Sequence, residues 1–362
     1  MTSAREHIVQ MMKFAPAQRD HVPAFRIALS VAIPLLILLF TDHLELAIYS
    51  AFGGFTALYA RNEPRASRFK HQSQAGIILC LCIAIGMLLS GFHASIWVTT
   101  LVCSAIGGVG AMVSTVLNLR PGGSLFHIFA TAAVASVPVA THPAIPLAVA
   151  IASAGFSVVL GLVSSVVGEG IKIVSTPPPH SLTRNQLLEQ GVIYFFVTLI
   201  AGCVGYVLGL SHSYWAMVAA NAIVVGPNMY ARFYRGVQRT VGTFVGVLIT
   251  AFFVSMHPDQ WHMAVLVIVF QFLAEIFVLR NYGFAMLFVT PLALFMIQLA
   301  KPLTSYELLT DRMLETAIGA VVGMLAVLVT RSPDKLGQDT VAIPILRAAR
   351  NVRGSVRSNF DQ

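Results

Sequence analysis

Long apolar runs constrain the fold of this chain more than any other feature of its sequence. A helix needs roughly 20 apolar residues to cross about 30 Å of hydrocarbon, and 57% of the 362 residues are hydrophobic whereas only 10% are charged. Water-soluble globular proteins do not have this composition. The sequence therefore predicts an all-α integral membrane protein. Its expected spans, about twelve in number, lie near residues 25–41, 46–60, 73–91, 95–118, 124–140, 144–168, 190–210, 213–229, 240–256, 261–279, 283–300 and 311–330.

The two halves of the chain follow the same plan. Leu119-Arg120-Pro121-Gly122-Gly123 recurs as Leu279-Arg280-Asn281-Tyr282-Gly283, and Tyr49-Ser50-Ala51 matches Tyr214-Trp215-Ala216, at separations of about 160 to 165 residues. Six helices return a chain to the side on which it started. The halves are therefore predicted to be parallel repeats, related by a pseudo-two-fold axis along the membrane normal. A duplicated bundle of this kind usually encloses a path between its halves.

The repeats divide the chain into five predicted segments. A cytoplasmic N-terminal segment (1–24) precedes the first six-helix repeat (25–169), and a cytoplasmic linker (170–189) connects it to the second six-helix repeat (190–331) and a basic cytoplasmic tail (332–362). The linker contains three consecutive prolines and is too short to form a domain. Multi-pass insertion into the bacterial inner membrane is the expected location.

The basic residues set the expected orientation, because Lys and Arg are retained in cytoplasmic loops. All of the 23 Lys and Arg residues except Lys301 and Arg312 fall on the side of the N-terminus. Both termini are therefore predicted to be cytoplasmic. This rule also accounts for the formal net charge of +8, so no nucleic-acid partner is expected.

Catalytic and metal-binding motifs are absent from the sequence. The four cysteines lie within apolar spans and show neither disulfide nor zinc spacing, and no nucleotide-binding, zinc-protease or nucleophile-elbow motif occurs. We therefore expect no cofactor, no metal and no enzymatic activity. The major facilitator superfamily, which also has twelve helices in parallel halves, is the alternative fold, but residues 61–65 lack its loop signature.

Arginines near the cytoplasmic ends of the spans are candidate anion-binding residues, because a guanidinium meets a carboxylate as a planar fork. Arg239 is the first candidate, since it begins an apolar span. Arg120 and Arg280 are further candidates, because they occupy equivalent repeat positions beside glycine. The alternative is that each of these residues only anchors the topology at the lipid headgroups.

Aromatic and polar residues of the spans complete the predicted substrate site. Tyr214, Trp215 and Tyr282 lie near helix starts, where they either form aromatic belts or stack on an aromatic substrate. Asn221 is an uncharged polar residue in an apolar span, which indicates an interhelical hydrogen bond or a wet cavity. Thr290 precedes Pro291, and a proline in mid-span can break a helix where substrates often bind.

Few residues are candidates for proton coupling. Glu275 and His127 are the two candidates for carrying the coupled proton, and the alternative for each is a purely structural role. Arg312 and Glu315 lie one turn apart at the outer start of the last span, and we expect them to pair with each other.

The second half carries a series of motifs in a fixed order. They are Tyr214-Trp215-Ala216, Pro227, Arg235, Gln238-Arg239-Thr240-Val241-Gly242-Thr243 with Gly246, Asn281-Tyr282, Phe288-Val289-Thr290-Pro291-Leu292, and Arg312 with Thr316 and Gly319. In this order the chain resembles the fusaric acid resistance and aromatic acid exporter family, which is distantly similar to the plant aluminium-activated malate transporters. The first half departs from the pattern, because no Trp follows Tyr49, and the better-studied bacterial exporters carry a large cytoplasmic domain where this chain has a short linker.

The resemblance implies a secondary exporter of small organic anions, with aromatic carboxylic acids as the substrate class and the proton motive force as the energy source. Two other functions stay open from the sequence: a passive organic-anion channel and a non-transporting membrane scaffold. The expected partners are the substrate anion and the lipid bilayer. A homo-oligomer and a periplasmic adaptor are both compatible with such an exporter.

Overall fold

The computed structural model describes residues 9, 11–16, 19–139, 141–170, 182–210, 212–226, 228–300 and 305–330. Residues 1–8, 10, 17 and 18 of the predicted N-terminal segment, the three prolines of the linker and the predicted tail (332–362) lie outside the described residues. The regular structure of the described residues is helical. The elements of the first half are α2 (His21–Phe40), η1 (Leu44–Leu46), α3 (Ala47–Gly54), η2 (Phe55–Leu58), α4 (Arg65–Gly91), α5 (Ile96–Val116), α6 (Leu125–Ala135) and α7 (Ala144–Val163). Those of the second half are α8 (Arg184–Val207), α9 (Tyr214–Val224), α10 (Met229–Ser255), α11 (Gln260–Phe277), α12 (Tyr282–Ala300) and α13 (Ser305–Val329).

Within the described residues, nine helices are long and apolar enough to cross a membrane, namely α2, α4, α5, α7, α8, α10, α11, α12 and α13. Three further apolar helical segments, Leu44–Leu58, Leu125–Ala135 and Tyr214–Val224, are shorter. Every predicted span therefore contains a helix, and the protein is a multi-pass membrane protein. The short helices have a local cause, because Pro138 and Pro227 follow two of them in the sequence and the residue before a proline disfavours helical geometry.

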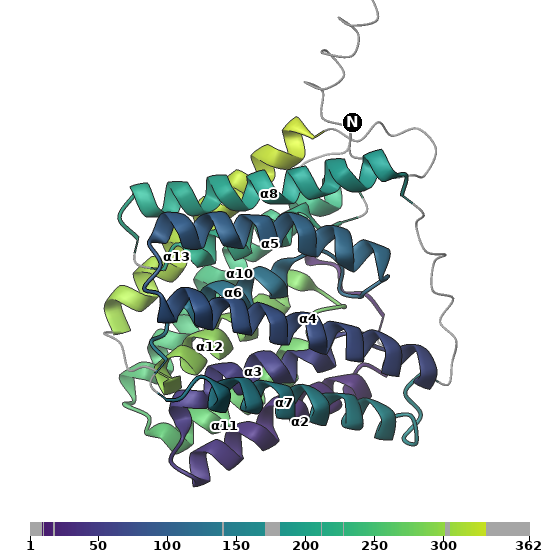
Figure 1. Ribbon diagram of the computed structural model, residues 1–362, viewed down its shortest axis with the longest axis vertical. Helices are drawn as coiled ribbons and strands as arrows, with labels where there is room; N and C mark the ends of the chain where they lie inside the picture. The colour runs from purple at the N-terminus through teal and green to yellow at the C-terminus, as the bar shows by residue number, and fades with distance from the viewer. Residues whose placement is uncertain are drawn as a thin grey trace, which may run out of the picture.

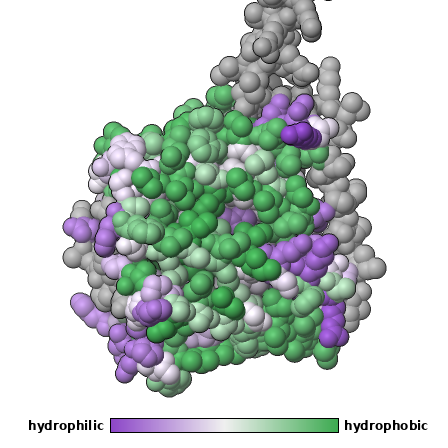
Figure 2. All heavy atoms as spheres, viewed as in Figure 1, coloured by the Kyte–Doolittle hydropathy of each residue, from purple (hydrophilic) through white to green (hydrophobic). Residues whose placement is uncertain are grey.

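The helices pack side by side and run across the view of Figure 1, from α8 at the top to α2 and α11 at the bottom. Figure 2 shows the same face covered by hydrophobic residues, with hydrophilic residues gathered at its left and right edges. A surface of this kind suits a lipid environment, since the apolar band lies between two polar rims. Exposed side chains such as Leu81, Val109 and Leu248 contribute to the apolar surface of the molecule.

Consecutive helices are joined mostly by short connections and are antiparallel to one another. One side of the bundle therefore holds the starts of α4, α6, α10 and α12. We call this the basic side, because Arg61, Arg65, Arg120, Arg235 and Arg280 lie there. The other side is called the opposite side.

The helix contacts of the first half have counterparts in the second. Helix α3 packs on α7 as α9 packs on α13, and α4 packs on α6 and α7 as α10 packs on α12 and α13. Between the halves, α5 contacts α8 and α2 contacts α11, and we call these contacts the α5/α8 seam and the α2/α11 seam. The halves also meet where α6 contacts α9 and where α3 and η1 contact α12.

Glycines allow a close backbone approach at the α5/α8 seam. A Cβ atom on Gly108 of α5 would lie 2.7 Å from the carbonyl oxygen of Gly191 on α8, and one on Gly107 would lie 2.6 Å from Thr198 Oγ1. Backbone atoms cannot move aside as flexible side chains can. The α5/α8 seam therefore depends on glycine at these positions.

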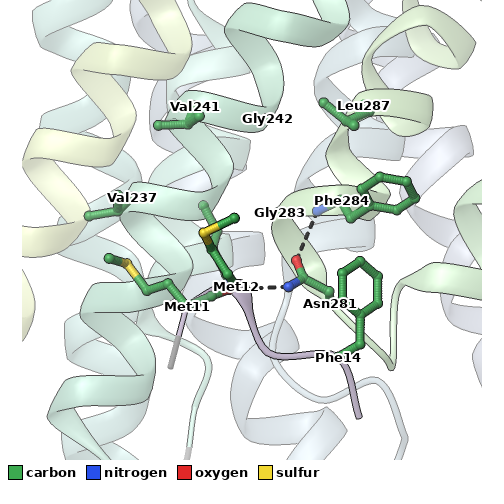
Figure 3. Close-up of a pocket in the computed structure, with 11 residues that line it drawn as sticks. Met11, Met12, Phe14, Val237, Val241, Gly242, Asn281, Gly283, Phe284 and Leu287 are labelled. Carbon is green, nitrogen blue, oxygen red and sulfur yellow. Dashed lines mark hydrogen bonds between the residues drawn. The ribbon is translucent and has the colours of Figure 1, made fainter. Parts of the chain in front are cut away.

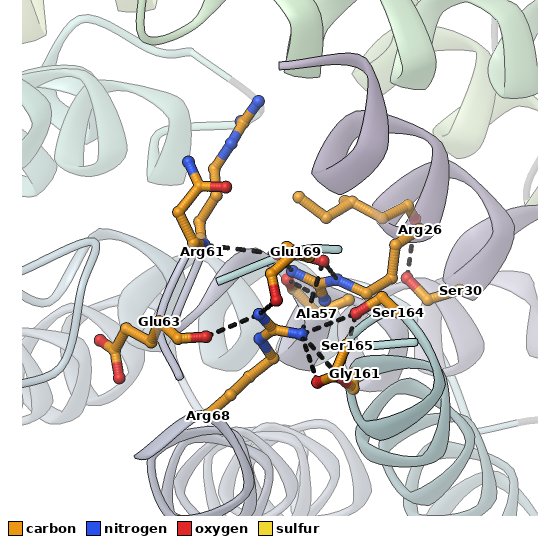
Figure 4. A network of polar contacts seen from close by, with 12 residues as sticks. Arg26, Ser30, Ala57, Arg61, Glu63, Arg68, Gly161, Ser164, Ser165 and Glu169 are labelled. Carbon is orange, nitrogen blue, oxygen red and sulfur yellow. Dashed lines mark hydrogen bonds and ion pairs between the residues drawn. The ribbon is translucent and has the colours of Figure 1, made fainter. Parts of the chain in front are cut away.

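A buried ionic network joins α2, α4 and the segment after α7 at the basic side (Figure 4). Arg26 Nε donates to Glu169 Oε2 at 2.9 Å, Arg26 Nη2 donates to Glu169 Oε1 at 3.2 Å, and Arg68 Nη1 lies 3.6 Å from Glu169 Oε2. Both arginines also donate to carbonyl oxygens, Arg26 to that of Ala57 and Arg68 to that of Gly161. These basic residues are structural members of the core and do not face the solvent.

Burial of Glu169 acts to raise the pKa of its carboxyl group, but the charge and hydrogen bonds of Arg26 and the charge of Arg68 outweigh burial and hold that pKa below its ordinary value of 4.5. A carboxylate with a depressed pKa stabilises the folded state above its unfolded pKa. This contribution is lost as the pH falls below 4.5 and through the lowered folded value.

We expect Glu169→Gln to lower the free energy of unfolding by about 3 to 5 kcal/mol, because it leaves the buried guanidinium groups without a countercharge. Thermal unfolding in detergent measures the change. Glu45→Gln is the control, since the side chain of Glu45 is 38% exposed and lies outside the network. The acid-dependent loss of stability below pH 4.5 should also weaken in Glu169→Gln, and an unchanged melting temperature and acid profile would contradict this account of the network.

We expect Gly108→Ala to lower stability by about 1 to 3 kcal/mol, the usual cost of overpacking, because the added methyl group meets the backbone of α8. Gly155→Ala on α7 is the matched control, since a Cβ there meets no atom within 4 Å. Alanine in a helix interior is favoured over glycine by about 0.5 to 1 kcal/mol. The melting temperature should therefore fall in Gly108→Ala and rise in Gly155→Ala. Equal melting temperatures of the two variants would show that the α5/α8 seam tolerates the methyl group.

Candidate functional site

A cavity of about 170 Å³ lies between the two halves. Helices α3 and α6 of the first half and α9 to α13 of the second half contribute to its walls. The walls are mostly apolar and aromatic, and the aromatic side chains are those of Phe52, Phe55, Phe126, Phe129, Trp215 and Tyr282. The charged and amide side chains of the lining are those of Arg239, Gln271, Glu275 and Arg312, all from the second half.

Arg239 enters the cavity from α10, whose first turns lie at the basic side. Arg239 is 4% exposed. Its Nη1 donates a hydrogen bond of 2.7 Å to the hydroxyl of Tyr282, and its Nε has no hydrogen-bond partner. The guanidinium carbon of Arg235 lies 4.8 Å from the centroid of the Tyr282 ring. Tyr282 is thus held by one arginine at its hydroxyl and by another at its ring face.

Arg312 enters the cavity from α13 and is 1% exposed. Its guanidinium carbon lies 3.7 Å from the centroid of the Trp215 ring, and its Nε and Nη1 have no hydrogen-bond partner. The expected pairing of Arg312 with Glu315 is replaced by another contact, because Glu315 Oε1 accepts a hydrogen bond of 2.9 Å from the backbone N–H of His212. A buried donor without an acceptor costs free energy, and a bound anion removes that cost.

Sequence reasoning did not select Arg312 as a site residue. The signal that could have found it is its position within the first third of a long apolar helix, since a charged residue inside a membrane span usually marks a substrate path. The i, i+3 spacing to Glu315 favoured a local pair instead. The spacing of residues along one helix does not show which side chains of the neighbouring helices they contact.

Gln271 and Glu275 lie one turn apart on α11 and are linked. Gln271 Nε2 donates to Glu275 Oε1 at 3.2 Å, and Glu275 Oε2 accepts from Arg61 Nη1 of the first half at 3.2 Å. Gln271 Oε1 is buried and has no hydrogen-bond partner. The cavity therefore presents both unpaired donors and an unpaired acceptor to its interior.

Three predicted site residues are packed around the cavity without lining it. Tyr214 stacks on Phe129 with ring centroids 6.5 Å apart. Asn221 Nδ2 donates to Thr198 Oγ1 at 2.9 Å, so it forms the interhelical hydrogen bond that was one of its two predicted roles. Thr290 is fully buried where α12 faces Gly246 of α10.

Helix α12 continues through Pro291 from Tyr282 to Ala300. The sequence suggested that this proline breaks the helix. At this point α12 packs closely on α10, since a Cβ on Gly246 would lie 2.7 Å from Thr290 Cβ. The cavity is thus formed between helices and not at a helix break.

The remaining predicted residues lie away from the cavity lining. Arg120 is exposed, and its carbonyl oxygen accepts from the N–H of Ala60. Arg280 Nε donates to the carbonyl oxygen of Ala15 at 3.5 Å. His127 is fully buried on α6, and neither of its ring nitrogens has a hydrogen-bond partner.

The N-terminal segment crosses the basic ends of α10 and α12 beside a second, apolar cavity of about 330 Å³ (Figure 3). Gln238 Nε2 and Asn281 Nδ2 donate to the carbonyl oxygen of Met11 at 2.8 and 3.1 Å, and the ring of Phe14 packs edge-on against that of Phe284. Gln238 and Asn281 each precede a residue that faces the central cavity. Gln238 therefore contacts the N-terminal segment while the next residue, Arg239, lines the cavity, and Asn281 and Tyr282 are arranged in the same way.

Among the described residues, no group of three or more His, Cys, Asp or Glu side chains is arranged to hold a metal ion. The cavity presents two arginines, an amide, a carboxylate and aromatic walls. This donor set suits an organic anion with an apolar body.

Comparison with known proteins finds a family model that matches part of the second half. Residues 200–326 match the model of the fusaric acid resistance protein-like family. The chain is also 26% identical over 143 residues to the uncharacterized membrane protein YvaC of Bacillus subtilis (strain 168). That alignment covers 39% of this chain and 23% of the relative, so the chain spans less than a quarter of the relative's length. No solved structure matches the chain.

The family match confirms the resemblance that the motifs indicated. It includes the helices that supply Arg239, Gln271, Glu275, Tyr282 and Arg312 to the cavity. The similarity to plant aluminium-activated malate transporters stays a prediction from the sequence. The chain is thus a multi-pass membrane protein whose residues 200–326 form a fusaric acid resistance protein-like segment.

Proposed function

We propose that this protein is a secondary transporter that exports small organic anions, with aromatic carboxylates as the substrate class, across the bacterial inner membrane. The observation that carries the proposal is the pair of buried guanidinium groups, Arg239 and Arg312, whose unpartnered nitrogens line an aromatic cavity between the halves. A cavity of about 170 Å³ suits a molecule smaller than a typical drug. The proposal assigns transport and no enzymatic activity.

The proposed architecture has twelve helices in two parallel six-helix repeats, with both termini cytoplasmic. The matched helix contacts of the two halves support the repeats. The concentration of arginines on the basic side supports its assignment as the cytoplasmic side. In this arrangement the three short helical segments count among the twelve and lie inside the bundle.

The two arginines would act in succession along the path. Arg239 lies ten residues, or about 15 Å, from the start of α10 at the basic side, and Arg312 lies seven residues, or about 10 Å, from the start of α13 at the opposite side. A carboxylate entering from the cytoplasm therefore meets Arg239 and Tyr282 first. Trp215 and Arg312 then receive it toward the exit, while the aromatic walls contact its ring.

The proton motive force is the proposed energy source. Glu275 is the favoured coupling residue, because it is the carboxylate on the cavity wall and contacts Gln271 and Arg61. His127 is the second candidate, although it does not line the cavity. Neutralising the coupling residue should leave downhill exchange intact and remove accumulation against a gradient.

Uptake of labelled hydroxybenzoate into proteoliposomes, with and without an imposed pH gradient, tests the proposal. We expect accumulation that exceeds equilibrium and collapses when a protonophore is added, since coupled transport stores work as a substrate gradient. Protein-free vesicles are the control. Flux that runs only downhill would indicate a passive channel, and no flux across a panel of aromatic and aliphatic acids would contradict the proposal.

We expect Arg239→Ala and Arg312→Ala each to lower the initial rate of this flux by about tenfold or more, because each removes a charge-assisted contact worth about 1.5 to 3 kcal/mol. Lys70→Gln is the control, since Lys70 is an exposed cation on α4 outside the cavity. Arg312→Lys keeps the charge but loses the fork, and it should retain part of the rate. If Arg239→Ala and Arg312→Ala both transport as fast as the parent, the cavity is not the substrate site.

A further inference from the structure

One ion pair joins the two halves at the basic end of the central cavity. Arg61 lies in the turn before α4, and its Nη1 and Nη2 donate to Glu275 Oε2 at 3.2 Å and to the carbonyl oxygen of Glu275 at 2.8 Å. Glu275 is also part of the cavity wall. The pair therefore lies between the cavity and the basic side of the bundle.

Each partner of this pair is fixed to its own half. The backbone N–H of Asn62 donates to Glu169 Oε1, so the turn that carries Arg61 is attached to the buried network of Arg26 and Glu169. Glu275 is held on α11 by the hydrogen bond from Gln271. Relative movement of the halves would therefore separate Arg61 from Glu275 and would leave both anchors intact.

The two seams between the halves differ in how they are sealed. The α5/α8 seam has glycine backbones in close contact and, near the basic side, a neutral hydrogen bond of 3.0 Å from Thr115 Oγ1 to Gln190 Oε1. Thr115 lies 160 positions before Glu275, the offset that relates Leu119 to Leu279. The α2/α11 seam has larger side chains, such as Leu35 and Phe270, and the ion pair lies beside it, since Arg61 Nη2 also donates at 3.3 Å to the carbonyl oxygen of Asp20, the residue before α2. Of the two residues related by this offset, Thr115 thus has a neutral partner in the other half and Glu275 has a charged one.

We propose that Arg61 and Glu275 form the cytoplasmic gate of the cavity, which opens by separation of the α2/α11 seam while the α5/α8 seam acts as the hinge. The proposal rests on the proposed function, because it takes the cavity as the transport path. An arriving carboxylate competes with Glu275 for the guanidinium of Arg61 and so favours the open gate.

The partial exposure of the pair suits a contact that must break and re-form. The side chains of Arg61 and Glu275 are 9% and 11% exposed, whereas those of Arg26 and Glu169 are 3% and 0% exposed. Water at the basic side can solvate the first two charges once they separate. Breaking the fully buried pair would leave its charges without solvent, so that pair stays closed.

Thiol accessibility tests the gate without any substrate. Ala51 lines the cavity from α3, and in an Ala51→Cys background the rate of modification by a polar maleimide in detergent reports how often the cavity opens. The four native cysteines give a background rate that is measured in the chain without Ala51→Cys. We expect Arg61→Gln and Glu275→Gln each to raise the rate by about tenfold, which corresponds to about 1.4 kcal/mol.

Three controls separate a gate from general loosening. Arg65→Gln, an exposed neighbour at the start of α4, and Thr115→Val, on the α5/α8 seam, should label at the rate of the background. Arg61→Lys keeps the charge and should also label slowly. The double variant Arg61→Glu with Glu275→Arg re-forms the pair with its charges exchanged and should restore slow labelling.

Equal labelling of the background, Arg61→Gln and Glu275→Gln would overturn the gate. So would faster labelling in Thr115→Val than in Glu275→Gln, because the opening seam would then be the other one. Arg61→Gln and Glu275→Gln each remove the same ion pair, but from different halves. The labelling rate can therefore be measured in one of them even if the other reduces the yield of folded protein. Since labelling needs no transport, the gate and the transport function can fail independently.

Discussion

The structure depends on how it satisfies charged groups inside an apolar bundle, where water cannot solvate them. Arg26, Arg68 and Glu169 answer this constraint by mutual pairing and by hydrogen bonds to carbonyl groups. Arg239 and Arg312 form no ion pair within the part of the chain that the structure describes, and both line the cavity, each with at least one nitrogen that lacks an acceptor. The first group holds helices together at the basic side. The second group is the one to which the proposed function assigns the substrate anion, so a countercharge from the protein distinguishes the two groups.

Much of this organisation could be predicted from the sequence, for reasons that are local. Apolar runs identify helices because hydrocarbon requires them, and the sequence offers as candidates Arg239, Trp215 and Tyr282, which line the cavity in the structure. Arg312 could not be identified from the sequence, since its contact with Trp215 joins α13 to α9. The positive-inside rule likewise gives the side on which Arg68 lies, but burial depends on the helices around it.

The matched contacts of the halves make their differences informative. Two equivalent seams flank the cavity, yet one is closed by glycine backbones and the other by bulky side chains with an ion pair. The polar lining also comes from one half, whereas the first half supplies aromatic walls and the ionic anchor of Arg61. In the proposed transporter, the second half would thus contact the solute through polar groups, and the first half would shape and close its surroundings.

The N-terminal segment has a mechanical link to the cavity. Gln238 and Asn281 bind the backbone of Met11, and the next residues along the chain, Arg239 and Tyr282, contact each other inside the cavity. Met11 is thus one peptide bond removed, in each helix, from a pair of residues that contact each other at the cavity. A purification tag or fusion partner added at the N-terminus would therefore be attached to a segment that contacts α10 and α12 directly.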